Sequence, residues 1–141
     1  ERIERYRERI SGPLLDRIDM HIEIARQRDW LEHDKKPSAE SSEIVRQRVV
    51  RARQVQLDRQ QKLNHFLAVN ELKNIAVLDV ECQEFMRQAF ERFFLSARAY
   101  HRIVKLARTI ADMGSEPNIE LKHLSEALNL RCLDRVGTQQ T

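Results

Sequence analysis

The stretch SARAYHRIVKLARTIADM, residues 96–113, decides the fold class of this chain. Its apolar side chains recur at intervals of three and four residues, which places them on one face of an amphipathic helix. Ser96 can cap the first turn of that helix, and Gly114 stands just beyond its end as a stop signal. The pattern predicts a helix whose apolar face is buried by these residues: Tyr100, Ile103, Val104, Ala107, Ile110 and Ala111.

Other stretches of the chain have a helical period or helix-capping residues. A long helix is expected to begin at Ser41 or Ser42 and to run to about Gln61, with Ile44, Val45, Val49, Ala52 and Gln56 along one side. A short helix over 71–76 can be capped by Asn70, and a helix over 80–93 by Asp79. A last helix is expected over 120–130. The sequence therefore predicts a mainly α chain, a small bundle of four to five helices.

The composition agrees with a helical bundle. Of 141 residues, 41% are hydrophobic and 33% are charged, while only three are glycine and three are proline. A sheet-rich domain would need more turn residues. The formal net charge of +3 permits contact with phosphate but does not require it. No apolar run approaches the roughly 18 residues that span a bilayer, and we expect a cytoplasmic protein.

The cysteines and histidines give no sign of a metal site. Cys82 and Cys132 have no metal-ligand spacing and are expected to be buried free thiols within helices. The five histidines form no ligand cluster. We therefore predict no metal bound by these residues.

One segment departs from the helical pattern. In SGPLLDRIDMHIEI, residues 11–24, Ile18, Met20, Ile22 and Ile24 alternate with polar residues. A period of two predicts a strand with one buried face, here over about 17–24. A single strand is not stable in water by itself. We therefore expect residues 1 to about 40 to be disordered or packed in a non-native way.

The helix over 96–113 also carries four basic residues at spacings of four, three and three: Arg98, Arg102, Lys105 and Arg108. They predict a basic stripe, which is either a solvated face or a surface that contacts phosphate or DNA. Arg98 differs from the others because it falls in the first helical turn, where the helix dipole disfavours a cation. Its position suggests a specific task, and simple exposure on the surface is the alternative.

Two motifs carry a family resemblance. RISGPLLDRIDMHIEI (9–24) and LSARAYHRIVKLARTIADM (95–113), followed by HLSEALNLRCLDR (123–135), resemble the C-terminal part of the ComM/YifB family of magnesium-chelatase-like AAA+ ATPases. The resemblance covers residues 1–135. It implies that residues 1–40 are a remnant of the ATPase core with its last strand near 18–24, that residues 41–135 form the helical lid, and that residues 136–141 are a disordered tail.

The resemblance also implies a function. The Walker A loop, the Walker B acid and sensor 1 of such ATPases would lie upstream of Glu1, so the chain alone should be inactive and bind no nucleotide. Arg17, in LLDRID, matches the arginine finger presented to a neighbouring subunit, although an ion pair with Asp16 or Asp19 is the alternative. Arg98, in LSARAYHR, matches sensor 2, which touches the γ-phosphate within its own subunit.

The parent protein would then be a homo-oligomeric ring motor that uses ATP and Mg²⁺ at its subunit interfaces. The family resemblance implies that the motor acts on DNA, as a branch-migration helicase in competence, with no role at a membrane. Two alternatives remain from the residues and the resemblance. One is a helical module that binds nucleic acid through the basic stripe, and the other is the lid of a true magnesium chelatase ATPase subunit.

Overall fold

The computed structural model describes residues 14, 17–22, 24 and 40–131. Within these residues the chain forms five α-helices and one short 3-10 helix. The α-helices are α3 (Ser42–Gln60), α4 (Val69–Ile75), α5 (Val80–Arg92), α6 (Ala97–Met113) and α7 (Leu121–Asn129), and η2 spans Asn64–Phe66. The predicted fold class, a mainly α bundle of four to five helices, is confirmed.

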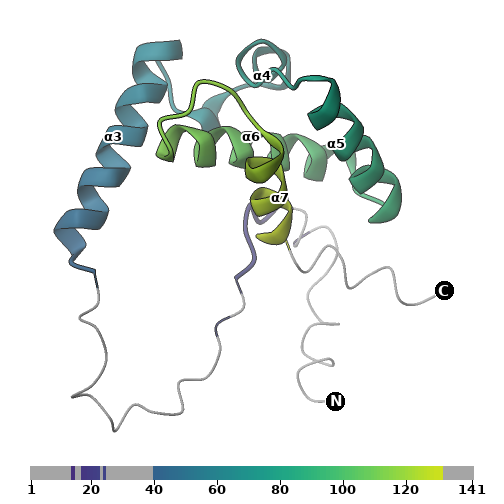
Figure 1. The fold of residues 1–141 in the computed structure, drawn as a ribbon, viewed down its shortest axis with the longest axis horizontal. Coiled ribbons are helices and arrows are strands. Elements are labelled where there is room, and N and C mark those ends of the chain that lie inside the picture. Colours follow the sequence, from purple (N-terminus) through teal and green to yellow (C-terminus); the bar gives the residue numbers. More distant parts are fainter. Residues whose placement is uncertain (1–13, 15–16, 23, 25–39, 132–141) are drawn as a thin grey trace, which may run out of the picture.

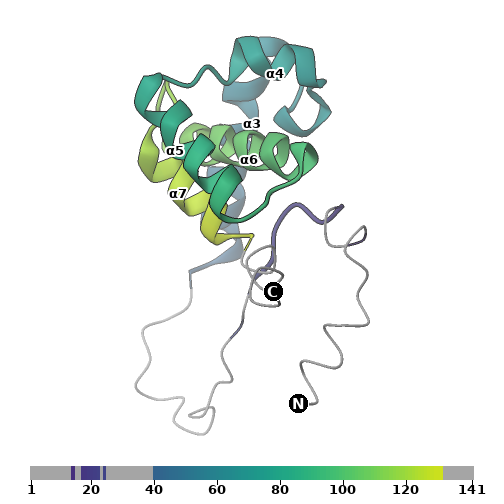
Figure 2. The ribbon, with the colours of Figure 1, turned by 90° about the vertical axis from the view of Figure 1, so that its right-hand side faces the viewer.

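Helix α6 is the centre of the bundle. It packs against α3, α4, η2 and α7, while α5 packs against α7. Figure 1 shows α6 across the middle with α3 on one side and α5 on the other, and Figure 2 shows the same arrangement from the side. Ile103 and Ala107 of α6, Met86 of α5 and Leu124 of α7 are fully buried in the shared core. The apolar face predicted over 96–113 therefore organises the bundle.

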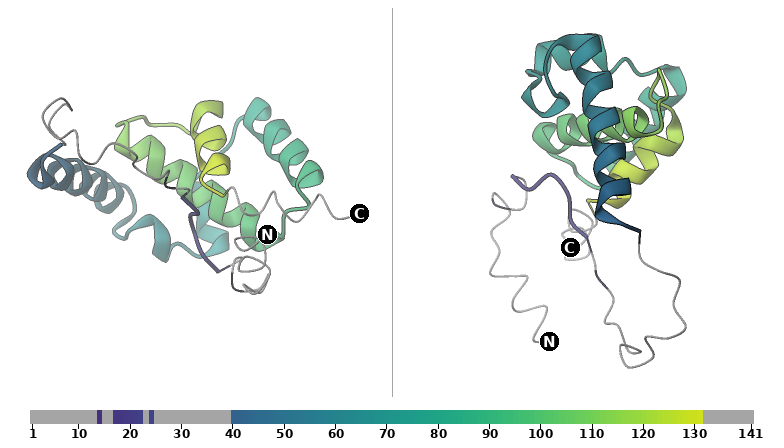
Figure 3. Two further views of the ribbon diagram at one scale, coloured as in Figure 1. Left: turned by 90° about the horizontal axis from the view of Figure 1, so that it is seen from below. Right: turned by 90° about the vertical axis from the view of Figure 1, so that its left-hand side faces the viewer.

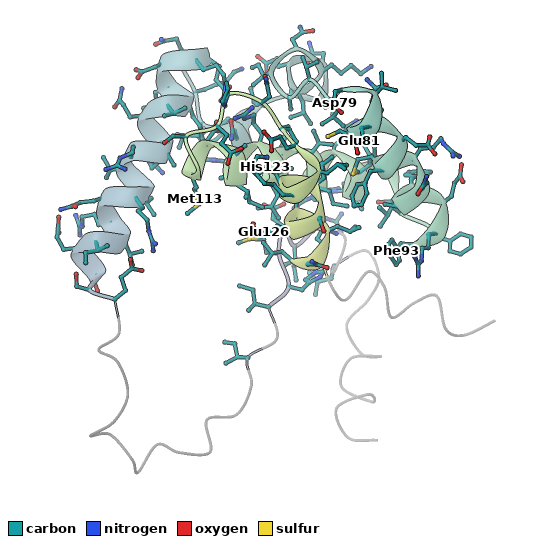
Figure 4. The ribbon with its side chains drawn as sticks, viewed as in Figure 1. Asp79, Glu81, Phe93, Met113, His123 and Glu126 are labelled. Atoms are coloured by element: carbon teal, nitrogen blue, oxygen red, sulfur yellow. The ribbon has the colours of Figure 1, made fainter. Side chains whose placement is uncertain are left out.

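The predicted caps are mostly present. The side chain of Ser41 accepts a hydrogen bond from the Ile44 amide at 3.4 Å. Asp79 accepts from the Cys82 amide at 2.7 Å at the start of α5, where Figure 4 labels it. Ser96 accepts from the Ala99 amide at 3.0 Å at the start of α6. Each cap satisfies an amide that has no partner within the helix, and so fixes where the helix begins.

One predicted helix start is wrong, whereas the predicted end of α6 at Gly114 is confirmed. Helix α4 begins at Val69 after the cap residue Ala68, not after Asn70. The Glu71 carboxylate accepts a hydrogen bond from the Ala68 amide at 2.7 Å, which stabilises this earlier start. Gly114 caps the C-terminus of α6 but has a φ of −79°, whereas Ser115 takes the left-handed conformation with a φ of 57°. The glycine therefore stands one residue before the position that favours it.

The N-terminal half of α3 extends beyond the bundle. Residues 42–51 are all exposed, and burial begins at Ala52 and continues at Gln56. Figure 3 shows this end of the helix leading away from α6. The apolar side predicted for α3 is thus buried only near its C-terminus, while Ile44, Val45 and Val49 remain in solvent.

The predicted strand near 18–24 appears, in its described residues, as a single parallel bridge between His21 and Arg131. Ile22 and Ile24, on the side predicted to be buried, are 67% and 85% exposed, whereas His21 on the polar side is buried. Among the residues that the structure describes, no sheet covers this apolar side. The disorder predicted for residues 1–40 and 136–141 concerns mainly residues outside the described ranges.

Cys82 is buried as a free thiol, as predicted. Burial, together with its contact with Asp79, raises the pKa of Cys82 to about 12. Cys132 lies outside the described residues. Among the described helices, none has the length and apolar character needed to cross a membrane.

Candidate functional site

Arg98 lies in the first turn of α6 and its side chain is exposed. That turn contains no acidic residue, and the capping hydroxyl of Ser96 is occupied by the Ala99 amide. The positive end of the helix dipole and the guanidinium group therefore add to each other. The arrangement is unfavourable for an isolated helix and favourable for binding an anion.

A groove between α5 and α6 opens beside this helix start. It is lined by Gln83, Arg87 and Phe90 of α5 and by Ala97, Tyr100 and His101 of α6. The rings of Phe90 and Tyr100 meet edge to face, with centroids 6.4 Å apart. The groove therefore has an aromatic wall, and Arg98 is not among the residues that line it.

Arg17 begins the described N-terminal segment 17–22 and is exposed. Its amide donates a hydrogen bond to the carbonyl of Leu14 at 3.0 Å. The segment then packs at the end of α7, where the His21 amide donates to the Leu130 carbonyl at 2.6 Å. Figures 1 and 2 show this contact between the N-terminal segment and the last helix.

Arg131 and Arg102 attach the same segment to the bundle. Nη1 of the buried Arg131 donates to the carbonyls of Ile18 at 2.7 Å and Asp19 at 3.3 Å. The carboxylate of Asp19 forms an ion pair with the guanidinium of Arg102 on α6. The elements that carry Arg17 and Arg98 are thus joined through Asp19 and Arg102.

The predicted basic stripe does not form one exposed surface. Arg98 is exposed, but the side chain of Arg102 is only 20% exposed and is held by Asp19. Nζ of Lys105 donates to the His65 carbonyl at 3.3 Å, and burial, together with the charge of Arg102, lowers the pKa of Lys105. These two residues lie partly inside the bundle, which reduces what they can offer to phosphate.

For Arg108 the prediction of an exposed phosphate contact is wrong. The residue is 2% exposed. Its guanidinium donates to the carbonyls of Pro117 at 2.8 Å and Glu116 at 2.6 Å, and to the carboxylate of Asp112. Arg108 faces the loop between α6 and α7. The N–H groups of its guanidinium are therefore used in hydrogen bonds within the protein.

Asp112 is the centre of a buried network that the sequence analysis missed. Its carboxylate receives hydrogen bonds from Arg59 of α3, Asn64 of η2 and Arg108 of α6, at 2.5–3.1 Å. Burial opposes ionisation, yet the hydrogen bonds from Arg59 and Asn64 and the charge of Arg108 hold the pKa of Asp112 below its usual value. The sequence did contain a signal for this network. Asp112 directly follows the apolar Ala111 and lies on the buried side of the helix.

Comparison with known proteins gives the family. Residues 39–131 match the family described as magnesium chelatase, subunit ChlI C-terminal, and residues 1–31 match the family described as magnesium chelatase, subunit ChlI. The chain therefore belongs to the magnesium chelatase ChlI C-terminal family, within the group that includes the ComM/YifB proteins.

Two relatives place the chain within that group. It is 38% identical over 136 residues to the competence protein ComM of Haemophilus influenzae, and 38% identical over 136 residues to the uncharacterized protein YifB of Escherichia coli. In both comparisons the match covers 96% of this chain and 27% of the relative. The predicted family is thus confirmed, and the chain spans about a quarter of the length of the relatives it matches.

Proposed function

We propose that this chain is the lid region of a larger AAA+ ATPase, and that Arg98 contacts the phosphates of ATP in its own subunit. The observation that supports this role most is the exposed guanidinium in the first turn of α6, a turn that has no acidic residue to balance it. An incoming phosphate would meet both the side chain and the helix terminus. The groove lined by Ala97 and Tyr100 opens at the same end of α6.

Arg17 is proposed to act on the neighbouring subunit as an arginine finger. It is exposed at the start of a segment that is fixed to the lid by His21 and Asp19. Fixation matters because a finger must reach the transferring phosphoryl group with an accurate position. The partner would be a second copy of the same protein in a ring, because a finger and the site it serves form a head-to-tail interface.

Mg²⁺ would not be held by the described part of this chain. Its residues contain no group of three histidine, cysteine, aspartate or glutamate side chains that could bind a metal. The ligands of a nucleotide-bound magnesium ion would belong to the core of the parent protein. The described residues would supply positive charge to the phosphates and no metal ligands.

The work of the ring is proposed to be done on DNA. This part rests on the resemblance to the ComM/YifB family and on a relative named as a competence protein. Binding of the full-length parent to double-stranded DNA should weaken as salt is raised, with a negative slope of log affinity on log salt concentration. An affinity independent of salt, or no binding at low salt, would contradict a DNA motor.

The first experiment compares ATP hydrolysis by the full-length parent as wild type, Arg98→Ala and Arg17→Ala. Loss of the finger should lower the rate by about 10³-fold or more. Arg48→Gln is the matched control, because Arg48, in the exposed N-terminal half of α3, pairs with Glu40 on the surface. The control should hydrolyse ATP at the wild-type rate.

Mixing the two inactive variants tests which residue acts in which subunit. A site in a random mixed ring is complete when its owner keeps Arg98 and its neighbour keeps Arg17. About a quarter of the sites meet that condition, so up to about a quarter of the wild-type rate should return, well above the rate of either variant alone. Normal hydrolysis by both single variants would overturn the assignment, and an inactive mixture would refute the division into own and neighbouring subunits.

A further inference from the structure

We propose that Asp19 and Arg102 are positioning residues that couple neighbouring ATP sites in the ring. This inference rests on the proposed roles of Arg17 and Arg98. In each subunit Arg98 would respond to the nucleotide of that subunit, while Arg17 would act on the nucleotide of the next. A mechanical link between these two residues would let the state of one site influence the other.

The contacts of the described residues provide such a link. Arg102 follows Arg98 by four residues, so the two lie one turn apart on the same side of α6. Asp19 follows Arg17 by two residues along the N-terminal segment. The ion pair between Asp19 and Arg102 therefore joins the helix of one arginine to the segment of the other.

Backbone contacts make this link stiff. The segment is held by Arg131 at the carbonyls of Ile18 and Asp19, and by the Leu130 carbonyl at the amide of His21. Arg131 itself is fully buried. A shift of α6 relative to the end of α7 would thus change the position of the segment, with Arg17 at its exposed end.

The ion pair is placed to respond to such a shift. The side chain of Asp19 is 66% exposed and that of Arg102 is 20% exposed. Water can replace Arg102 at the exposed carboxylate of Asp19 when the pair opens, so the pair contributes less to overall stability than a fully buried pair would. Its removal should therefore leave the fold intact and affect the communication between sites.

The test measures the dependence of ATP hydrolysis on ATP concentration in the full-length parent. Wild type should be cooperative, and Arg102→Gln and Asp19→Asn should each reduce the Hill coefficient to about 1. Both variants should keep far more of the maximal rate than Arg98→Ala. The reversed pair, Asp19→Arg with Arg102→Asp, should restore cooperativity, which a role in stability alone would not require.

Arg48→Gln serves again as the control, because it removes a surface ion pair that does not join these elements. The proposal is overturned if wild type is not cooperative, if Arg102→Gln keeps the wild-type Hill coefficient, or if the reversed pair stays non-cooperative. Arg98→Ala and Arg17→Ala belong in the same series. Normal hydrolysis by these two would show that the proposed function has failed, whereas their inactivity with an unchanged Arg102→Gln would show that only the link has failed.

Discussion

The guanidinium of Arg59, in the last turn of α3, donates two hydrogen bonds to the carboxylate of Asp112, near the end of α6, at 2.5 and 3.0 Å. Asn64 and Arg108 bind the same carboxylate. Three elements, α3, η2 and α6, are therefore joined at one buried charge. This network holds α3 to the central helix α6 at the C-terminal end of α3, the half of that helix that is partly buried.

Replacing Asp112 by Asn should strongly destabilise the bundle. The substitution keeps the size of the side chain but leaves the guanidinium of Arg108 buried without a counter-charge. Breaking a buried pair by removing one partner costs roughly 3–5 kcal/mol in the free energy of unfolding. Urea unfolding of the chain, followed by the helical circular dichroism signal, measures the change.

Glu40→Gln is the control for that measurement, because it breaks an ion pair with Arg48 in which both side chains are largely exposed. Such a pair contributes little, so the unfolding midpoint should not move measurably. Equal stability of Asp112→Asn and wild type would show that the buried carboxylate does not hold the helices together.

The same residue predicts a pH dependence. The pKa of Asp112 is lowered on folding, so its ionised form contributes stability that is fully present above the ordinary value of 3.8. That contribution is lost as the pH falls below 3.8 toward the folded pKa. The difference in unfolding free energy between wild type and Asp112→Asn should therefore be constant near neutral pH and shrink in acid. A difference that does not change as the pH is lowered would exclude this linkage.

The helices were predictable because local signals and burial agree in this chain. Capping residues at 41, 79 and 96 mark helix starts that the structure confirms. The apolar residues of α6 recur with a clear helical period, and the face they form is the one that packs in the shared core. At the start of α4 two local signals compete: the Glu71 carboxylate accepts from the Ala68 amide three residues earlier, and the cap expected at Asn70 is not used.

The candidate site was only partly predictable. The position of Arg98 in the first helical turn could be recognised from the capping residue Ser96 and the helical period of the apolar residues. The exposure of Arg98 and the burial of Arg108 could not be told apart from the sequence, because both residues lie on the same predicted basic stripe. The loop after α6 returns two carbonyls to Arg108, and contacts of that range are not encoded in helical spacing. The pairing of Asp19 with Arg102 spans 83 residues and could not be found from local pattern either.

Cys82 should resist alkylation in the folded chain. Burial raises its pKa to about 12, so the reactive thiolate is scarce at pH 8, and the side chain is 1% exposed. Treatment with iodoacetamide followed by peptide mass spectrometry should show slow labelling of Cys82 in buffer and rapid labelling in urea. Rapid modification in the native state, at the rate of a free thiol in a short peptide, would contradict the buried position.

Ser115→Gly should stabilise the chain. Ser115 has a φ of 57°, and its amide donates to the Asp112 carbonyl at 3.1 Å while the Glu116 amide donates to the Ala111 carbonyl at 2.9 Å. These two bonds form a Schellman motif, in which the left-handed residue is usually glycine. Serine pays a steric penalty there that glycine avoids, so we expect a gain of about 1 kcal/mol in unfolding free energy.

Gly114→Ala provides the matched comparison at the next residue. Gly114 has a φ of −79°, a backbone conformation that any residue can adopt. An added Cβ would lie 3.3 Å from Oε1 of Glu116. That carboxylate is at the end of a flexible side chain and can move by a few tenths of an ångström. Gly114→Ala should therefore change the free energy of unfolding much less than replacing a glycine in the left-handed conformation by alanine would. Thermal unfolding of both variants decides the matter: a large loss in Gly114→Ala together with no gain in Ser115→Gly would place the special conformation at 114 instead.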